Sequence, residues 1–163
     1  MSSRQDSNTS SYVFIAILCV LWLVLHFTGK SPLYHAIVNG ASMESTLYHD
    51  DKGLVFSYEP VHRYDIIVFS ACVQNKDTLL VKRVIGLPGD IVECKSHVVY
   101  VNGDPIVEFA KDTSANTDFE AVTVPENSYF VLGDNREVSY DSRYSEIGFV
   151  PRDKITGIFY KVS

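Results

Sequence analysis

The chain has 163 residues, of which 46% are apolar and 21% charged, enough for one globular domain and too few for a multi-domain enzyme. This composition excludes wholesale disorder, a collagen-like chain and a protein with several membrane spans. Fourteen Lys and Arg residues against twenty Asp and Glu residues give a formal charge of −6. Nucleic acid is therefore not expected as a partner, because phosphate binding needs a basic surface.

The N-terminal region predicts a membrane anchor. Residues 1–11 form a short polar tail, and residues 12–29 contain no Asp, Glu, Lys or Arg, a length at the lower limit for crossing a bilayer. A buried core helix is disfavoured because the segment is apolar on every side. A cleaved signal peptide is disfavoured because no small residues mark a cleavage site. We expect an uncleaved transmembrane anchor at residues 12–29. Its orientation is poorly defined by the sequence, because one basic residue lies on each side of it, Arg4 and Lys30.

The remainder, residues 31–163, is predicted to be one β-rich domain. Short apolar runs and period-two alternation indicate strands, and no helical stripe of useful length occurs. Asn102-Gly103 predicts a tight hairpin, since a type I′ turn needs two positive φ angles. The polar stretch 111–118 is expected to be a loop. The expected strands cover residues 54–57, 65–69, 79–85, 91–94, 97–101, 106–109, 129–132 and 155–162. The fold class that follows is mainly β, an antiparallel sheet domain with one N-terminal transmembrane helix.

Several kinds of site find no support in the sequence. The His and Cys residues lack zinc-ligand spacing, so no metal and no cofactor are expected. Cys72 and Cys94 could pair outside the cytosol, but two cysteines make no disulfide framework. The residues around Ser42 differ from a nucleophile elbow because Glu44 takes the place of the second glycine, which disfavours an α/β-hydrolase.

Three short segments carry the functional signal: residues 40–47, 81–90 and 133–143. Each alone is typical of a turn, of a lysine that snorkels from a strand, or of a solvated loop. Together, in this order and behind an anchor, they resemble the bacterial type I signal peptidases, which are membrane-anchored serine proteases with a Ser/Lys dyad. The resemblance covers nearly the whole chain, and its short length is similar to the Gram-positive form. It implies an antiparallel β-sheet catalytic domain.

The resemblance also implies roles for individual residues. Ser42 falls on the family nucleophile, Lys82 on the general base, and Ser139 on the hydroxyl that bonds and orients the lysine. The residues that match the support of the dyad are Asp134, Asn135, Arg136, Asp141 and Arg143. Those expected near the oxyanion and the substrate are Gly40, Met43 and Arg83. Ser45 stands where the family has proline, so the loop that carries Ser42 lacks a fixed φ.

The chemistry of a Ser/Lys pair agrees with these roles. A serine hydroxyl needs a neighbouring base, and lysine is a base only as the neutral amine, against a solution pKa of about 10.4. Apolar neighbours of Lys82 should desolvate its ammonium and lower its pKa, and a fall of two units costs about 2.7 kcal/mol. Arg83 cannot serve, because a guanidinium stays protonated. The flanking apolar residues are Leu80, Val81, Val84 and Ile85.

Stabilisation of the oxyanion is only partly assigned. The backbone N–H of Ser42 is the expected donor. Gly40 offers no hydroxyl, and the sequence names no second donor.

The expected function is therefore removal of signal peptides from exported preproteins at the outer face of the cell membrane. The catalytic domain is expected to be extracytoplasmic, and the expected partners are the lipid bilayer and the signal-peptide region of preproteins, with pilins as one candidate class. The family implies small residues at the cleavage site. The alternative is a signal-peptidase-like accessory factor that assembles surface pili with little or no proteolysis. A soluble self-cleaving repressor shares the dyad chemistry but is disfavoured by the anchor.

Overall fold

The computed structural model describes residues 12–20, 23, 33–57, 59–106 and 109–162. The chain divides into two units, residues 1–32 and 33–163. In the first unit, residues 12–20 and 23 are helical. The rest of the anchor predicted at 12–29 lies outside the described residues. None of the helices in the described part of the chain is long and apolar enough to cross a membrane.

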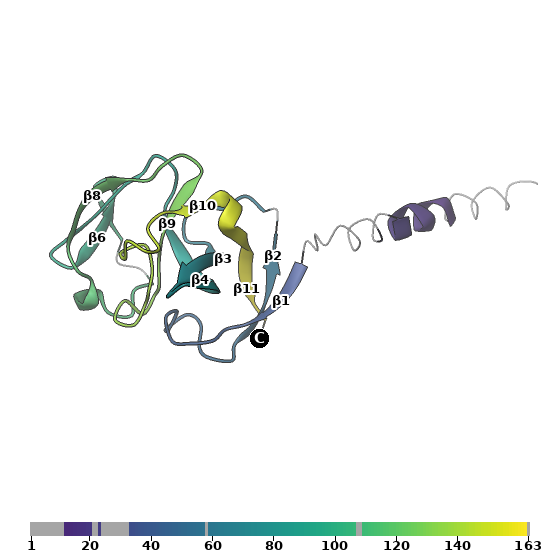
Figure 1. Ribbon diagram of the computed structural model, residues 1–163, viewed down its shortest axis with the longest axis horizontal. Coiled ribbons are helices and arrows are strands. Elements are labelled where there is room, and N and C mark those ends of the chain that lie inside the picture. Colours follow the sequence, from purple (N-terminus) through teal and green to yellow (C-terminus); the bar gives the residue numbers. More distant parts are fainter. Residues whose placement is uncertain (1–11, 21–22, 24–32, 58, 107–108, 163) are drawn as a thin grey trace, which may run out of the picture. The chain divides into compact units, whose positions relative to one another are not determined.

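The second unit is built from two sheets (Figure 1), and their antiparallel pairing is as the sequence predicted. All strand pairs within the described residues are antiparallel. The larger sheet has the order β1 (Leu33–Ile37), β2 (Lys52–Phe56), β11 (Ile155–Lys161), β3 (Ile66–Val73), β4 (Lys76–Gly86), β9 (Ser128–Leu132) and β10 (Val150–Pro151). The smaller sheet has the order β7 (Asp104–Ile106), β6 (Val98–Val101), β5 (Ile91–Lys95) and β8 (Phe119–Thr123). Two short 3₁₀ helices are η1 (Thr113–Ala115) and η2 (Arg152–Lys154).

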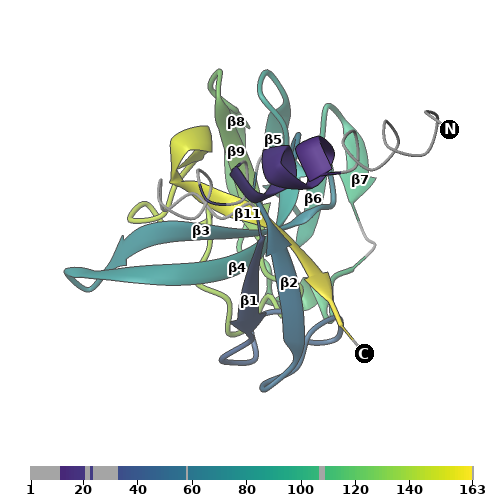
Figure 2. The same ribbon diagram turned by 90° about the vertical axis from the view of Figure 1, so that its right-hand side faces the viewer.

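β3 and β4 form a long hairpin that projects from the larger sheet in Figure 2. Its turn residues Gln74 and Asn75 both have positive φ, 51° and 61°. The inner part of β4 contributes to the core between the two sheets, where Ile85 and Leu132 of the larger sheet pack with Val92 and Val99 of the smaller one. Burial on both faces explains why these strands are apolar runs.

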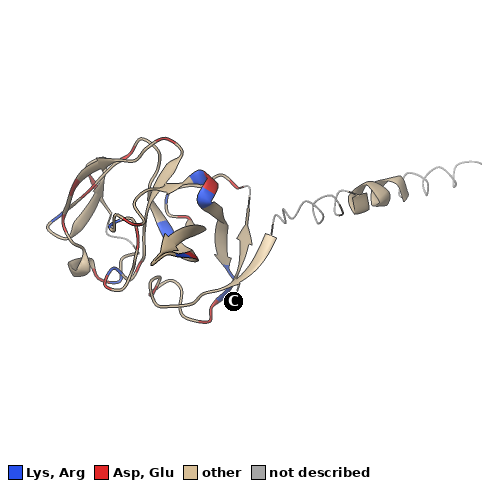
Figure 3. Ribbon diagram, viewed as in Figure 1, with Lys and Arg blue, Asp and Glu red and all other residues tan. Residues whose placement is uncertain are grey.

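Most charged residues lie on the connections between strands (Figure 3). The exceptions that matter are Lys82 and Arg83, which are adjacent on β4 and almost fully buried. Charged side chains are rarely buried unless they are paired, so we expect Lys82 and Arg83 to have specific polar partners inside the fold.

The structure corrects several sequence-based boundaries. The predicted strand at 106–109 is wrong, because β7 covers Asp104–Ile106 and Phe109 has a φ of +69°. The loop predicted at 111–118 contains η1, whose N-cap Asp112 accepts a hydrogen bond from the Ser114 amide. Strands β1, β8 and β10 were not predicted, since β1 and β8 are short and mostly exposed and β10 has only two residues. The Asn102-Gly103 hairpin is confirmed, with φ of 54° and 89°.

Substituting a core residue of β3 tests the packing of the larger sheet. Ile67→Ala removes a fully buried side chain and should cost about 2–5 kcal/mol in the free energy of unfolding. Ile91→Ala is the matched control, because Ile91 is 48% exposed and should cost less than about 1 kcal/mol. Urea unfolding of the detergent-solubilised chain measures both, and equal losses would contradict the described core.

Candidate active site

The site begins with two consecutive residues of β4 that project to opposite faces of the sheet, as neighbours in a strand must. Lys82 is opposite Ile67 in the ladder with β3, and Arg83 is opposite Ile66. The Nζ atom of Lys82 donates to Ser42 Oγ at 2.9 Å and to the carbonyl oxygen of Val81 at 2.7 Å. Residues 40 positions apart in the sequence therefore meet in one hydrogen bond.

The loop that carries Ser42 is held from both sides. The next residue, Met43, is fully buried, as is Leu47, and both pack into a cluster with residues of β2, β3 and β11. The carbonyl oxygen of Ser42 accepts a hydrogen bond from the Asn135 amide at 3.0 Å. Gly40 has a φ of +108°, which a residue with a side chain rarely adopts. Buried anchors thus fix the loop although Ser45 replaces the family proline.

On one side of the dyad lies a buried ion pair. The guanidinium of Arg83 donates from Nε to Asp134 Oδ1 at 2.9 Å and from Nη2 to Oδ2 at 2.7 Å. Thr46 Oγ1 donates to the same carboxylate at 2.5 Å. Arg83 also donates to the Tyr64 carbonyl, and its guanidinium carbon lies 4.0 Å from the centre of the Phe109 ring. This bidentate arrangement neutralises Asp134 without exposing it to water.

A second ion pair lies close by. Arg143 donates to both oxygens of Asp141, at 2.8 and 3.0 Å, and Asp141 also accepts the Gly133 amide at 3.0 Å. A further Arg143 bond reaches the Arg136 carbonyl, and Arg136 Nε donates to the Gly133 carbonyl at 2.9 Å. Gly133 packs against Ser139, and an added Cβ would lie 2.5 Å from the Ser42 carbonyl oxygen. Only glycine fits at position 133.

The environment of Lys82 makes its amine a stronger candidate base than an exposed lysine. Burial lowers its pKa from 10.5 to about 8, because desolvation disfavours the ammonium. The negative charges of Asp141 and Asp134 act in the opposite direction and raise it. Burial prevails over the two carboxylates, so the neutral amine is available near neutral pH.

One expected contact is not formed. The sequence comparison predicted a hydrogen bond between Lys82 and the hydroxyl of Ser139, but the Nζ donors go to Ser42 and to Val81. Ser139 Oγ is buried and has no hydrogen-bond partner among the described residues. The Val81 carbonyl accepts a hydrogen bond from Lys82 instead, so the lysine is held in place without Ser139.

The dyad lies in a cleft with a volume of about 330 Å³. Its wall on one side comes from residues 35–39, at the end of β1, and on the other side from residues 79–82 of β4. Val68 and Phe159 complete an apolar lining next to the two polar groups. A mostly apolar cleft with a few polar groups is typical of a ligand-binding site.

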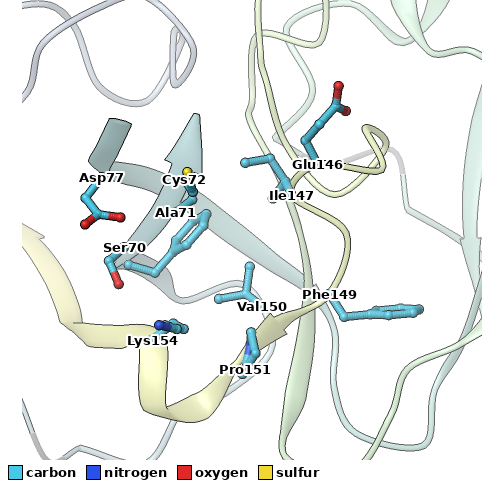
Figure 4. A pocket seen from close by; sticks show the side chains of 11 residues that line it. Ser70, Ala71, Cys72, Asp77, Glu146, Ile147, Phe149, Val150, Pro151 and Lys154 are labelled. Carbon is cyan, nitrogen blue, oxygen red and sulfur yellow. The ribbon is translucent and has the colours of Figure 1, made fainter. Parts of the chain in front are cut away.

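A separate hollow of about 200 Å³ contains none of the predicted catalytic residues (Figure 4). Among its lining residues are Cys72, Asp77, Glu146 and Lys154. Cys72 is exposed there, whereas Cys94 is buried in the smaller sheet, and both thiols are free, so the disulfide that the sequence left open is not formed. Across the described residues, no group of His, Cys, Asp and Glu side chains is placed to hold a metal ion.

Sequence reasoning missed four residues that contact the site. Thr46 belongs to the first motif, and its spacing from Ser42 was available as a signal. Phe109, Lys111 and Asn116 also touch residues of the site, but they lie in a polar connection with no motif. Only the folded chain brings these residues to Arg83, Glu44 and Arg136.

A family model described as signal peptidase, peptidase S26, matches residues 8–161. This chain belongs to that family. It is 34% identical to signal peptidase I of Bacillus licheniformis, over 96% of this chain and 91% of the relative, and 36% identical to that of Bacillus caldolyticus over the same shares. Signal peptidase IB of Staphylococcus aureus is 32% identical, over 88% of this chain and 84% of the relative.

The solved structures agree with the sequence comparisons. A crystal structure of a signal peptidase I from Enterococcus faecalis matches with a TM-score of 0.53 and 35% identity, over 63% of this chain and 98% of that chain. The protein is thus a peptidase, and its relatives support removal of signal peptides. The alternative of a non-proteolytic assembly factor has no support among these relatives.

The lowered pKa of Lys82 predicts the pH dependence of peptide cleavage. The ammonium is inactive as a base, so the rate should fall about tenfold per pH unit below a limb near pH 8 and level off above it. The measurement is kcat/KM against pH on one peptide substrate. His35→Gln serves as a control for the histidine that lines the cleft, and it should leave the position of the limb unchanged. A limb near pH 6.5 that disappears in this variant would rule out lysine as the base.

Proposed function

We propose that the protein is a membrane-anchored serine endopeptidase that removes signal peptides from exported preproteins by a Ser42/Lys82 dyad. The observation that carries the proposal is the 2.9 Å contact between Ser42 Oγ and a buried Lys82 amine whose pKa is lowered to about 8. A buried lysine beside a serine hydroxyl is otherwise costly, because burial penalises its charge.

In the proposed reaction, neutral Lys82 accepts the proton of Ser42 Oγ as this oxygen attacks the scissile carbonyl carbon. The tetrahedral intermediate collapses, the C–N bond breaks, and the ammonium of Lys82 returns its proton to the leaving amine. Water then attacks the acyl-enzyme, and Lys82 takes a proton from it and delivers it to Ser42 Oγ. One base thus serves both steps, without a metal or cofactor in the proposal.

The oxyanion is proposed to bind the backbone N–H of Ser42, which no acceptor occupies among the described residues. Ser139 is proposed to orient the lysine during the reaction. Its support is a buried hydroxyl that has no described partner and packs against Gly133, next to the Ser42 carbonyl. The ammonium formed in the first step needs a further acceptor, and a free hydroxyl within the site can supply it.

The substrate is proposed to bind as an extended strand. β4 pairs with β3 from Lys76 to Arg83, but β9 pairs only with its last residues, from Arg83 to Gly86. The backbone of residues 79–82 therefore lines the cleft on an edge that no described strand covers. A peptide can add to this edge by main-chain hydrogen bonds, with its side chains entering the cleft alternately.

Membrane attachment is proposed from the apolar segment at 12–29, with residues 31–163 outside the cytoplasm. The segment is apolar enough to enter a bilayer, and an exported preprotein presents its cleavage site at the outer surface of the membrane. Lipid and the signal-peptide regions of preproteins, pilins among the candidates, are the proposed partners.

Substitution of the dyad tests the mechanism. Ser42→Ala and Lys82→Ala should each lower preprotein cleavage by at least about 10³-fold, and the double variant should be no worse, because the two residues act as one unit. Lys82→Arg should be equally inactive, since guanidinium does not deprotonate. Circular dichroism confirms that each variant is folded. Full cleavage by folded Ser42→Ala would refute the dyad.

The proposed topology predicts where an added protease can act. In intact spheroplasts, protease should digest residues 31–163 while a cytoplasmic control protein survives. Complete protection of the domain would reverse the orientation. A mature N-terminus near residue 30 would show that the apolar segment is cleaved.

A further inference from the structure

The connection between β7 and β8 of the smaller sheet contacts the site on the larger sheet. Residues 109–116 of this connection are called the strap below. Phe109 lies over the guanidinium of Arg83, 4.0 Å from the ring centre to the guanidinium carbon. The amide of Lys111 donates to the Asp134 carbonyl at 2.8 Å, and its Nζ donates to Glu44 Oε2 at 2.9 Å. The strap therefore contacts all three motifs, or residues directly beside them.

Asn116 forms the deepest of these contacts. It is 2% exposed, its Oδ1 accepts from Arg136 Nη1 at 3.0 Å, and its Nδ2 donates to the His97 carbonyl at 2.8 Å. One end of the side chain therefore holds the turn before β6, and the other end holds an arginine of the third motif. A buried amide with both ends bonded has one orientation and can transmit a position.

Arg136 continues the path toward the nucleophile. It is 3% exposed, and its Nε holds the carbonyl of Gly133 at 2.9 Å. Gly133 is the residue that packs against both Ser139 and the Ser42 carbonyl. Displacement of Arg136 would thus shift the backbone of Gly133, which packs against the Ser42 carbonyl.

Arg136 also has charged neighbours. Burial lowers its pKa, as does the positive charge of Arg143, whereas the carboxylates of Asp141 and Asp134 and the Cys94 thiol raise it. The same two carboxylates raise the pKa of Lys82. The position of the Arg136 guanidinium therefore matters for Lys82. The closer it lies to these carboxylates, the more it offsets their negative charge and the less they favour the ammonium form of Lys82.

We propose that the strap positions the catalytic residues, with Asn116 acting through Arg136 and Lys111 acting through Glu44. The inference rests on the proposed Ser/Lys mechanism. It makes the smaller sheet part of the catalytic apparatus, because the strap is anchored there by β7 and β8. A connection that merely joined these strands would need no contact with Arg83, Asp134, Glu44 and Arg136.

The first test is Asn116→Ala, assayed as peptide cleavage by the full chain in detergent. Loss of the acceptor frees Arg136, so kcat should fall about tenfold, with little change in KM. The limb near pH 8 should also move up by about half a pH unit, because the guanidinium of Arg136, once free of Asn116, can move away from the carboxylates of Asp134 and Asp141 and offset their charge less. If the substitution only lowered the fraction of folded protein, the rate would fall by the same factor at every pH and the limb would keep its position.

The matched control is His97→Asn. It removes the ring contact with the Asn116 carbonyl, 2.7 Å in the wild type, but leaves the Arg136 contact intact. Asparagine tolerates the positive φ of 66° at this position. The control should keep the wild-type kcat and limb. If Asn116→Ala also keeps both, or if the control shifts the limb equally, the positioning role is refuted.

The second test does not depend on a buried substitution. Lys111→Gln and Glu44→Gln change the charge beside Ser42 in opposite directions but break the same contact. Positioning predicts that both lower kcat by a similar factor and that the double variant is no worse than either single variant. Opposite limb shifts with unchanged kcat, or additive losses, would overturn the role of Lys111.

The outcomes separate this inference from the proposed function. If Ser42→Ala cleaves the peptide as well as the wild type does, the dyad fails and the strap has no catalysis to position. If cleavage depends on Ser42 and Lys82 but the strap variants behave like the wild type, the dyad stands and the strap inference fails.

Discussion

The site depends on keeping one amine buried beside two carboxylates. Lowering the pKa of Lys82 from 10.5 to about 8 corresponds to about 3 kcal/mol of disfavoured charge. Asp134 and Asp141 oppose this by attracting the ammonium. Each of the two carboxylates is bonded by an arginine, Arg83 or Arg143, which limits their effect on the lysine. The two buried ion pairs thus help to keep the pKa of Lys82 low, in addition to contributing to the stability of the fold.

Strand geometry makes this arrangement possible. Lys82 and Arg83 are neighbours on β4, so one faces the cleft and Ser42 while the other faces Asp134. The two cations are kept apart by the sheet itself. Arg83 bonds to Asp134, Thr46 and the Tyr64 carbonyl, so its guanidinium acts as a structural cation next to Lys82.

The nucleophile loop is rigid for reasons that its local sequence only partly suggests. Met43 and Leu47 are buried below it, and the Asn135 amide holds the carbonyl of Ser42 from above. Gly133 allows this close approach because it has no Cβ. Asn135 and Gly133 belong to the third motif, more than 90 residues from Ser42 in the sequence, and their contacts help to fix the loop although Ser45 stands where the family has proline.

The sequence by itself determined the antiparallel β-rich fold, the three motifs and the family resemblance, because alternation, turn residues and reactive residue types are local properties. It also indicated that Lys82 would be desolvated, since Leu80, Val81, Val84 and Ile85 surround it in the chain. Strands β1 and β8, the free state of Cys72, and the bond of Lys82 to the Val81 carbonyl required the structure. The placement of Asn116 against Arg136 was decided only by tertiary structure, because a contact across two sheets leaves no periodicity or motif in a polar connection.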